Sequence, residues 1–96
     1  MEYAGPTELY ISGEWTTASS GETIETEDPA TEEPYATVQK ADEDDVDAAV
    51  QAAAAAVEHG SEWRSMALDE RGQYMHAMAD AIEAMKDEIS MVESHD

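Results

Sequence analysis

Residues 75–92 read MHAMADAIEAMKDEISMV, and this stretch carries the strongest structural signal in the chain. Its large apolar side chains recur at alternating spacings of three and four residues; they are Met75, Met78, Ile82, Met85, Ile89 and Val92. This spacing predicts one long helix with a narrow apolar stripe, here called the Met75–Val92 seam, that packs on something else. No Gly, Asn or Pro follows the seam, so we expect the helix to continue past Asp96.

A shorter helix is predicted upstream of this one. Asp42 is a good N-cap, and the acidic residues that follow it suit a first helical turn because the helix dipole favours negative charge there. The dipeptide His59–Gly60 supplies an ending. One apolar face is formed by Val46, Val50, Ala53 and Val57. We therefore expect residues 42–96 to form a two-helix segment.

The first part of the chain has the period of β-strands. LYISGEW (residues 9–15) predicts a tight hairpin, because Ser12–Gly13 can form a two-residue primed turn. ETIETE (22–27) and YATVQKA (35–41) alternate in polarity and flank the turn-forming DPATEEP (28–34). After an N-terminal tail of residues 1–7, residues 8–41 should form β-hairpin strands. The predicted class of the isolated chain is α+β, with short antiparallel strands before two α-helices.

The composition is poor in large apolar residues and very rich in acids. Two Leu, four Ile and five Val make 11 of 96 residues, with no Phe, while 24 acidic residues face four basic ones for a net charge of −20. Two interpretations follow: an acidic disordered segment, or a folded protein adapted to very high salt. We favour salt adaptation, because the acids interrupt the periodic apolar patterns and do not replace them.

The same features bound the partners and the location. This much negative charge makes nucleic acid and anionic membranes poor partners. The N-terminus lacks the basic and apolar regions of a signal peptide, and the longest weakly polar run, residues 48–57, is too short to span a bilayer. We expect a cytoplasmic protein. The absence of Cys excludes disulfides and a thiolate nucleophile within these residues.

Candidate metal sites fail on spacing. A calcium loop beginning at Asp42 would need Gly at its sixth position and Glu at its twelfth, where the chain has Asp47 and Ala53. The acids are better explained as a helix cap. The three histidines lie too far apart in sequence for local metal-ligand spacing; they are His59, His76 and His95.

Other reactive or binding groups have simpler structural roles. The methionines could bind a soft metal, but their heptad spacing favours a packed face. Trp15 and Trp63 are expected to anchor the hairpin and the corner between the helices. Ser94 beside His95 is the nearest approach to a nucleophile and a base. We predict no catalytic, cofactor-binding or metal-binding residue in this chain.

The order of motifs closely resembles the N-terminal segment of the aldehyde dehydrogenase superfamily, and the acidic surface resembles that of a salt-loving archaeal member. Each motif is weak alone, but five occur in the family's order and spacing. They are Ile11–Trp15, Asp28–Glu33, Asp45–Val50, Trp63–Met66 and Glu70–Gly72. Four positions depart from the family pattern: Asp28 stands for Asn, Glu32 for Gly, and Ala67–Leu68 for Ser-Pro.

The resemblance implies an activity, and it places the reacting groups elsewhere. Family members oxidise an aldehyde to a carboxylate with NAD or NADP, and this region is the N-terminal part of their α/β cofactor-binding domain. Their catalytic Cys, general-base Glu, oxyanion Asn and cofactor-binding residues correspond to positions beyond Asp96. Some members bind a structural cation through main-chain carbonyls that would be those of Thr26 and Glu27, but the remaining ligands are missing here.

Three hypotheses follow. The first is an N-terminal fragment of an aldehyde dehydrogenase, truncated before the cofactor and catalytic residues and inactive alone. The second is an autonomous acidic module that oligomerises or binds a partner through the Met75–Val92 seam. The third is complementation by a separately encoded remainder of the enzyme.

Overall fold

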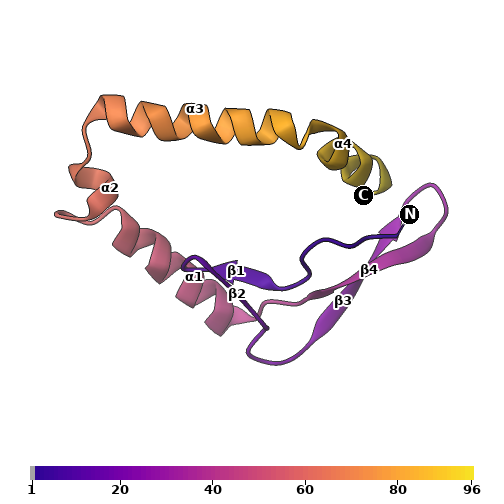
Figure 1. The fold of residues 1–96 in the computed structure, drawn as a ribbon. Helices are drawn as coiled ribbons and strands as arrows, with labels where there is room; N and C mark the ends of the chain where they lie inside the picture. Colours follow the sequence, from indigo (N-terminus) through magenta and orange to yellow (C-terminus); the bar gives the residue numbers. More distant parts are fainter. Residues whose placement is uncertain (1) are drawn as a thin grey trace.

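The chain folds into an open ring of strands and helices, shown by a computed structural model that describes residues 2–96 (Figure 1). The ring measures 48 × 34 × 17 Å. Its elements are β1 (Leu9–Ile11), β2 (Glu14–Thr16), β3 (Thr23–Asp28), β4 (Glu33–Gln39), α1 (Glu43–Ala56), α2 (Glu62–Ser65), α3 (Leu68–Ala84) and α4 (Lys86–His95). The predicted α+β class is confirmed: two separate antiparallel strand pairs precede the helices.

The β1–β2 hairpin forms as its turn residues predict. Ile11 pairs with Glu14 across a two-residue loop, in which Ser12 and Gly13 have φ angles of 55° and 79°. Positive φ at both positions is the signature of a primed turn, whose twist matches that of the strands. Tyr10 and Trp15 pair across the hairpin with ring centroids 4.7 Å apart. Trp15 therefore packs on its hairpin neighbour and stays half exposed.

The β3–β4 pair is longer and contains an irregularity. The register shifts between Thr26 and Glu27, where the opposite strand carries Pro34. Proline cannot donate a ladder hydrogen bond, so an irregular position accommodates it. In the connecting turn, the Asp28 side chain accepts a hydrogen bond from the Ala30 amide at 2.8 Å, and Glu32 has a φ angle of 59°. The turn is thus closed by an acidic residue, Glu32, in the left-handed region.

Helix α1 begins with the predicted cap. The Asp42 carboxylate accepts from the Asp45 amide and the Asp45 carboxylate accepts from the Asp42 amide, both at 3.0 Å. Asp45 is buried and also accepts the Ser19 amide, while the Ser19 hydroxyl donates to Asp42 at 2.8 Å. The Asp45 amide and the Ser19 hydroxyl hold the pKa of Asp42 below its usual value. This pair of carboxylates joins the loop before β3 to the start of α1.

The later helices differ from the expectation of one continuous rod. Helix α1 ends at Ala56, and Gly60, with φ of 82°, lies in the following turn. Ser61 then caps the short helix α2. The long helix divides at Met85, whose ψ of 10° lies outside the helical range and whose amide is shared between two carbonyls. No Pro or Gly marks this bend; it directs α4 towards β3–β4, whose residues bind the end of α4.

Almost nothing apolar is buried inside the ring. Among residues 2–96, Ala18 is the only apolar residue in the buried class, at 5% exposure. The chain exposes 7617 Å², whereas a compact monomer of 10.4 kDa would expose roughly 5,400 Å². Its radius of gyration is 16.9 Å, against about 12.5 Å for a compact domain of this length. The ring is therefore a shell around a space that the chain itself does not fill.

Candidate functional site: the apolar lining of the ring

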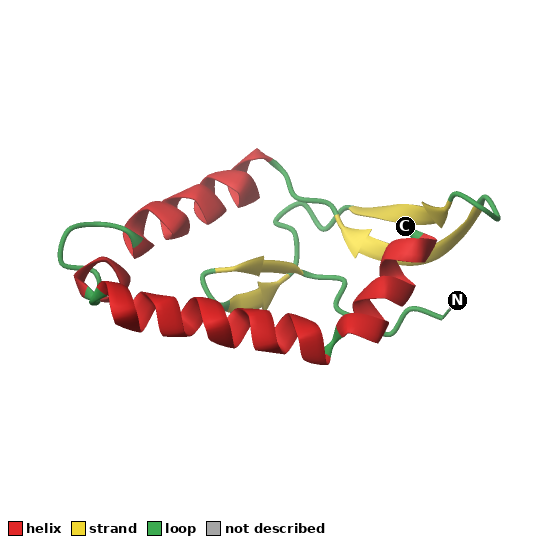
Figure 2. Cartoon of the chain, turned by 90° about the horizontal axis from the view of Figure 1, so that it is seen from above, coloured by secondary structure: helices red, strands yellow, loops and turns green. Residues whose placement is uncertain are grey.

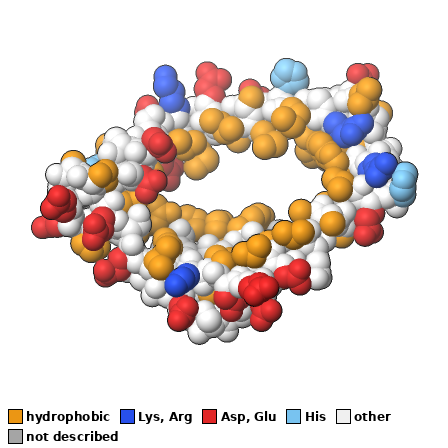
Figure 3. All heavy atoms as spheres, turned by 180° about the vertical axis from the view of Figure 1, so that it is seen from behind, with side chains coloured by type: hydrophobic (Ala, Val, Ile, Leu, Met, Phe, Trp, Pro, Cys, Tyr) orange, Lys and Arg blue, Asp and Glu red, His pale blue; other side chains and the backbone are white. Residues whose placement is uncertain are grey.

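Hydrophobic side chains surround the central opening of the ring (Figure 3). The two long helical arms of the ring carry exposed apolar faces. On α1, Val46 and Val50 are 55% and 60% exposed, and on α3, Met78 and Ile82 are 57% and 59% exposed. Helical periodicity aligned these residues on one face of each helix, and the fold then left both faces uncovered. The Met75–Val92 seam is therefore an open surface in this chain, not a core.

The chain exposes far more surface than a compact monomer of its mass. The exposed surface exceeds that of a compact monomer by roughly 2,200 Å², whereas a standard protein interface buries about 800 Å² on each partner. Monomeric proteins rarely expose contiguous apolar patches of more than a few hundred Å². The chain therefore exposes much more surface than a compact monomer, and the apolar faces of α1 and α3 are part of that surface.

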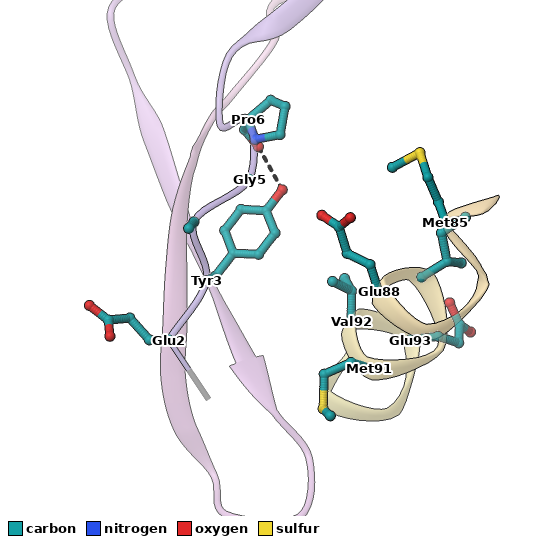
Figure 4. Close-up of a pocket in the computed structure, with 11 residues that line it drawn as sticks. Glu2, Tyr3, Gly5, Pro6, Met85, Glu88, Met91, Val92 and Glu93 are labelled. Carbon is teal, nitrogen blue, oxygen red and sulfur yellow. Dashed lines mark hydrogen bonds between the residues drawn. The ribbon is translucent and has the colours of Figure 1, made fainter. Parts of the chain in front are cut away.

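A groove runs along one end of this lining, between the N-terminal segment and α4 (Figure 4). Its volume is about 480 Å³, and its walls are residues 2–6 on one side and α4 side chains on the other. Tyr3 is held there by its hydroxyl, which donates to the Pro6 carbonyl at 2.8 Å, and by an edge contact with Tyr35. Met85 and Val92 line the opposite wall, so the seam continues into this groove.

The end of α4 and the β3–β4 pair lie together at the end of the ring opposite α2 (Figure 2). Polar contacts join the last residues of the chain to this strand pair there. His95 Nδ1 lies 2.7 Å from Asp28 Oδ2, and the Tyr35 hydroxyl donates to Asp96 Oδ1 at 2.8 Å. We call these two pairs the clasp. Contact with His95, followed by the Ala30 amide, lowers the pKa of Asp28, and the Asp96 carboxylate raises the pKa of Tyr35.

The clasp should respond to pH through Asp28. His95 lowers the pKa of Asp28 in the folded chain. The ionised Asp28 therefore adds to the free energy of unfolding above the unfolded pKa of 3.8, and this contribution is lost as the pH falls through the lower folded pKa. His95→Ala should therefore move the pKa of Asp28 upward, towards 3.8. A carbon-detected NMR titration of the Asp28 carboxyl in the full chain measures this shift.

His59→Ala is the matched control, since His59 lies in the turn after α1 and should leave Asp28 unchanged. An Asp28 titration that is identical in the His95→Ala variant and the parent would show that the pair does not form in solution.

The residues considered from sequence alone do not gather into a catalytic or metal site. In the part of the chain that the structure describes, no three His, Cys, Asp or Glu side chains lie close enough to hold a metal ion. Ser94 donates to the Met91 carbonyl at 2.9 Å, and His95 binds Asp28, so the two do not form a nucleophile and base. Trp63 packs edge-on against Tyr74 at 5.9 Å, at the corner predicted for it.

The clasp escaped the sequence prediction. From the sequence, Asp28 is expected to shape a turn and His95 is considered as a metal ligand or as a partner of Ser94, and neither expectation pairs the two residues. Their separation of 67 residues leaves no local signal, and periodicity gives no information on contacts between distant turns and helix ends.

The sequence of this chain is similar to the sequences of one enzyme family. The profile of the aldehyde dehydrogenase family matches residues 15–96. The cytosolic aldehyde dehydrogenase 1 of Elephantulus edwardii is 44% identical over 88 residues, which are 92% of this chain and 18% of that protein. Human retinal dehydrogenase 2 is 40% identical over 88 residues, which are 92% of this chain and 17% of that protein. The chain thus spans less than a fifth of the length of these relatives.

The fold agrees with the sequence comparison. The structure of the aldehyde dehydrogenase from Bacillus cereus in complex with NAD+ matches with a TM-score of 0.89 and 40% identity, over 96% of this chain and 18% of that one. The open ring is therefore similar to one part of a much longer solved chain. Within residues 2–96, none of the helices has the length and apolar character needed to cross a membrane.

Proposed function

Because the chain belongs to the aldehyde dehydrogenase family, we propose that residues 1–96 serve as the N-terminal segment of an NAD(P)-dependent aldehyde dehydrogenase. One observation carries this proposal: the ring matches about a fifth of a solved dehydrogenase while its own apolar lining is uncovered. In the proposed enzyme, the rest of the dehydrogenase fills the opening. Residues 1–7, 8–41 and 42–96 then form a tail, a strand region and a helical region of one partial domain.

The segment would act as a structural element and not as a source of reacting groups. Oxidation of an aldehyde by this family uses a cysteine thiolate, and the chain contains no Cys. The five glycines are scattered, so these residues do not fit a dinucleotide phosphate loop, and we assign them no contact with the cofactor. The aldehyde, the nicotinamide and the thiolate would all be held by the body of the enzyme, which the ring braces.

The proposal extends to the setting in which the enzyme works. The net charge of −20 on a 10.4 kDa segment supports adaptation to a salt-rich cytoplasm. The partner that we propose is the remainder of an aldehyde dehydrogenase, either in the same polypeptide or encoded separately.

The test joins this segment to a dehydrogenase body. Residues 1–96 would replace the matched segment of the Bacillus cereus enzyme, and NADH formation from an aldehyde would be followed at 340 nm. We expect the chimera to oxidise aldehyde and the isolated 96-residue chain to show no turnover. A soluble chimera without activity, or activity in the isolated chain, would contradict the proposal.

A further inference from the structure

Arg71 occupies a special position in the apolar lining. It lies four residues before Met75, so it continues the three-and-four spacing of the Met75–Val92 seam by one step towards the start of α3. Its neighbours three and four residues away are all uncharged: Ala67, Leu68, Tyr74 and Met75. A guanidinium group therefore projects from the same face of the helix as the seam.

This guanidinium has no acceptor within the described chain. Arg71 Nε is buried without a hydrogen-bond partner, although a quarter of all residues are acidic. The one ion pair found among residues 2–96 joins His95 to Asp28. Arg64, on α2, instead uses its Nη1 to donate to the Val57 carbonyl at 3.1 Å. Buried donors in native proteins are nearly always paired, and no hydrogen bond or ion pair of the Arg71 side chain is found among residues 2–96. Its terminal Nη groups are therefore the donors that remain for a partner outside the chain.

A protein surface that covers the seam would also remove the Arg71 guanidinium from water, and this determines which kind of partner group Arg71 needs. An unpaired guanidinium is very costly to remove from water, whereas a carboxylate can accept two parallel hydrogen bonds from its planar fork. We infer that the body of the dehydrogenase supplies an Asp or Glu carboxylate to Arg71 where it covers the start of α3. This inference rests on the proposed function, since it needs a body that covers the seam.

The experiment uses the chimera of residues 1–96 with the Bacillus cereus body and compares thermal melting of the parent and of Arg71→Met. Removing Arg71 would strand a buried carboxylate, which raises the folded-state pKa of that group. Above its unfolded pKa this costs stability, and the cost is relieved as pH falls and the carboxylate takes up a proton. Arg71→Met should thus melt several degrees below the parent at pH 8, and the gap should narrow towards pH 5.

Two further variants make the result specific. Arg71→Lys keeps the charge and should recover part of the loss, without the bidentate geometry. Arg64→Met removes a guanidinium that is already bonded to a carbonyl, so any loss should be independent of pH.

The possible failures are distinguishable. A gap between Arg71→Met and the parent that stays constant from pH 8 to pH 5, or no gap at all, would overturn the carboxylate while leaving an active chimera. An inactive parent chimera would overturn the proposed function and this inference with it.

Discussion

Ile82→Asp should abolish the activity of the chimera while leaving the isolated chain almost unchanged. In the isolated chain Ile82 is 59% exposed, so an acidic residue there should alter the free energy of unfolding by no more than about 0.5 kcal/mol. In the assembled enzyme the same side chain would be covered. The substitution would then forfeit about 1.5–3 kcal/mol of apolar burial and place an unpaired carboxylate in a dry interface. Together these effects should lower the equilibrium constant for docking of the segment on the order of 100-fold or more, and the recovered activity should fall with it.

The matched control is Gln73→Asp. Gln73 is exposed and, by helical spacing, lies on the face of α3 opposite Ile82. Gln73→Asp therefore adds the same negative charge on a face that we do not expect the dehydrogenase body to cover. Activity of soluble enzyme, measured at 340 nm in molar KCl, should be lost for Ile82→Asp and kept for Gln73→Asp. Equal activity of the two variants would show that the seam is not covered.

The same pair of variants separates the fragment from an autonomous module. A module that pairs through the Met75–Val92 seam would sediment as a defined oligomer, and Ile82→Asp would dissociate it whereas Gln73→Asp would not. A fragment should sediment as a monomer in all three forms. The comparisons already favour the fragment, because they match the chain to a dehydrogenase over nearly its whole length.

Much of the fold was predictable because its signals are local. The Ser12–Gly13 turn, the Asp42 cap and the change from a two-residue to a helical period each depend on residues close together in sequence. The sequence also predicted that the Met75–Val92 seam packs on something else, and the structure shows Met75, Met78 and Ile82 exposed. The chain has few large apolar residues and buries almost none of them. Its periodic apolar seam therefore stays uncovered.

The remaining features depend on contacts that no local pattern records. The bend at Met85 lies inside an uninterrupted helical pattern, and the clasp at the far end of α4 joins residues 67 positions apart. The bond between Ser19 and Asp45 spans 26 residues, and the orphaned Nε of Arg71 appears only when the surroundings of the side chain are known. Sequence periodicity identified the faces of the helices; it could not identify what each face meets.

The helix content of the isolated chain should rise steeply with KCl concentration. The distances between its negative charges determine the range of KCl concentrations over which this rise occurs. Dividing 7617 Å² among 24 acidic residues gives roughly 320 Å² for each, a mean spacing of about 18 Å. The screening length is about 30 Å at 0.01 M and about 10 Å at 0.1 M, so average repulsion should weaken within that range. The acids at the start of α1 are closer, at about 5–6 Å for helical neighbours. Their repulsion is screened only when the length approaches about 3 Å, near 1 M.

The ellipticity at 222 nm should therefore increase from 0.01 M KCl and continue to increase up to molar salt. Amide substitutions on exposed acids of α1, α3 and α4 test whether screening is the cause, because they remove charge and keep shape. The combined variant carries Asp47→Asn, Asp80→Asn, Glu83→Gln and Glu93→Gln. It should reach half of the transition at a lower KCl concentration than the parent. Since self-repulsion opposes a chain that buries almost no apolar area, a signal unchanged from dilute to molar KCl would remove the argument for salt adaptation.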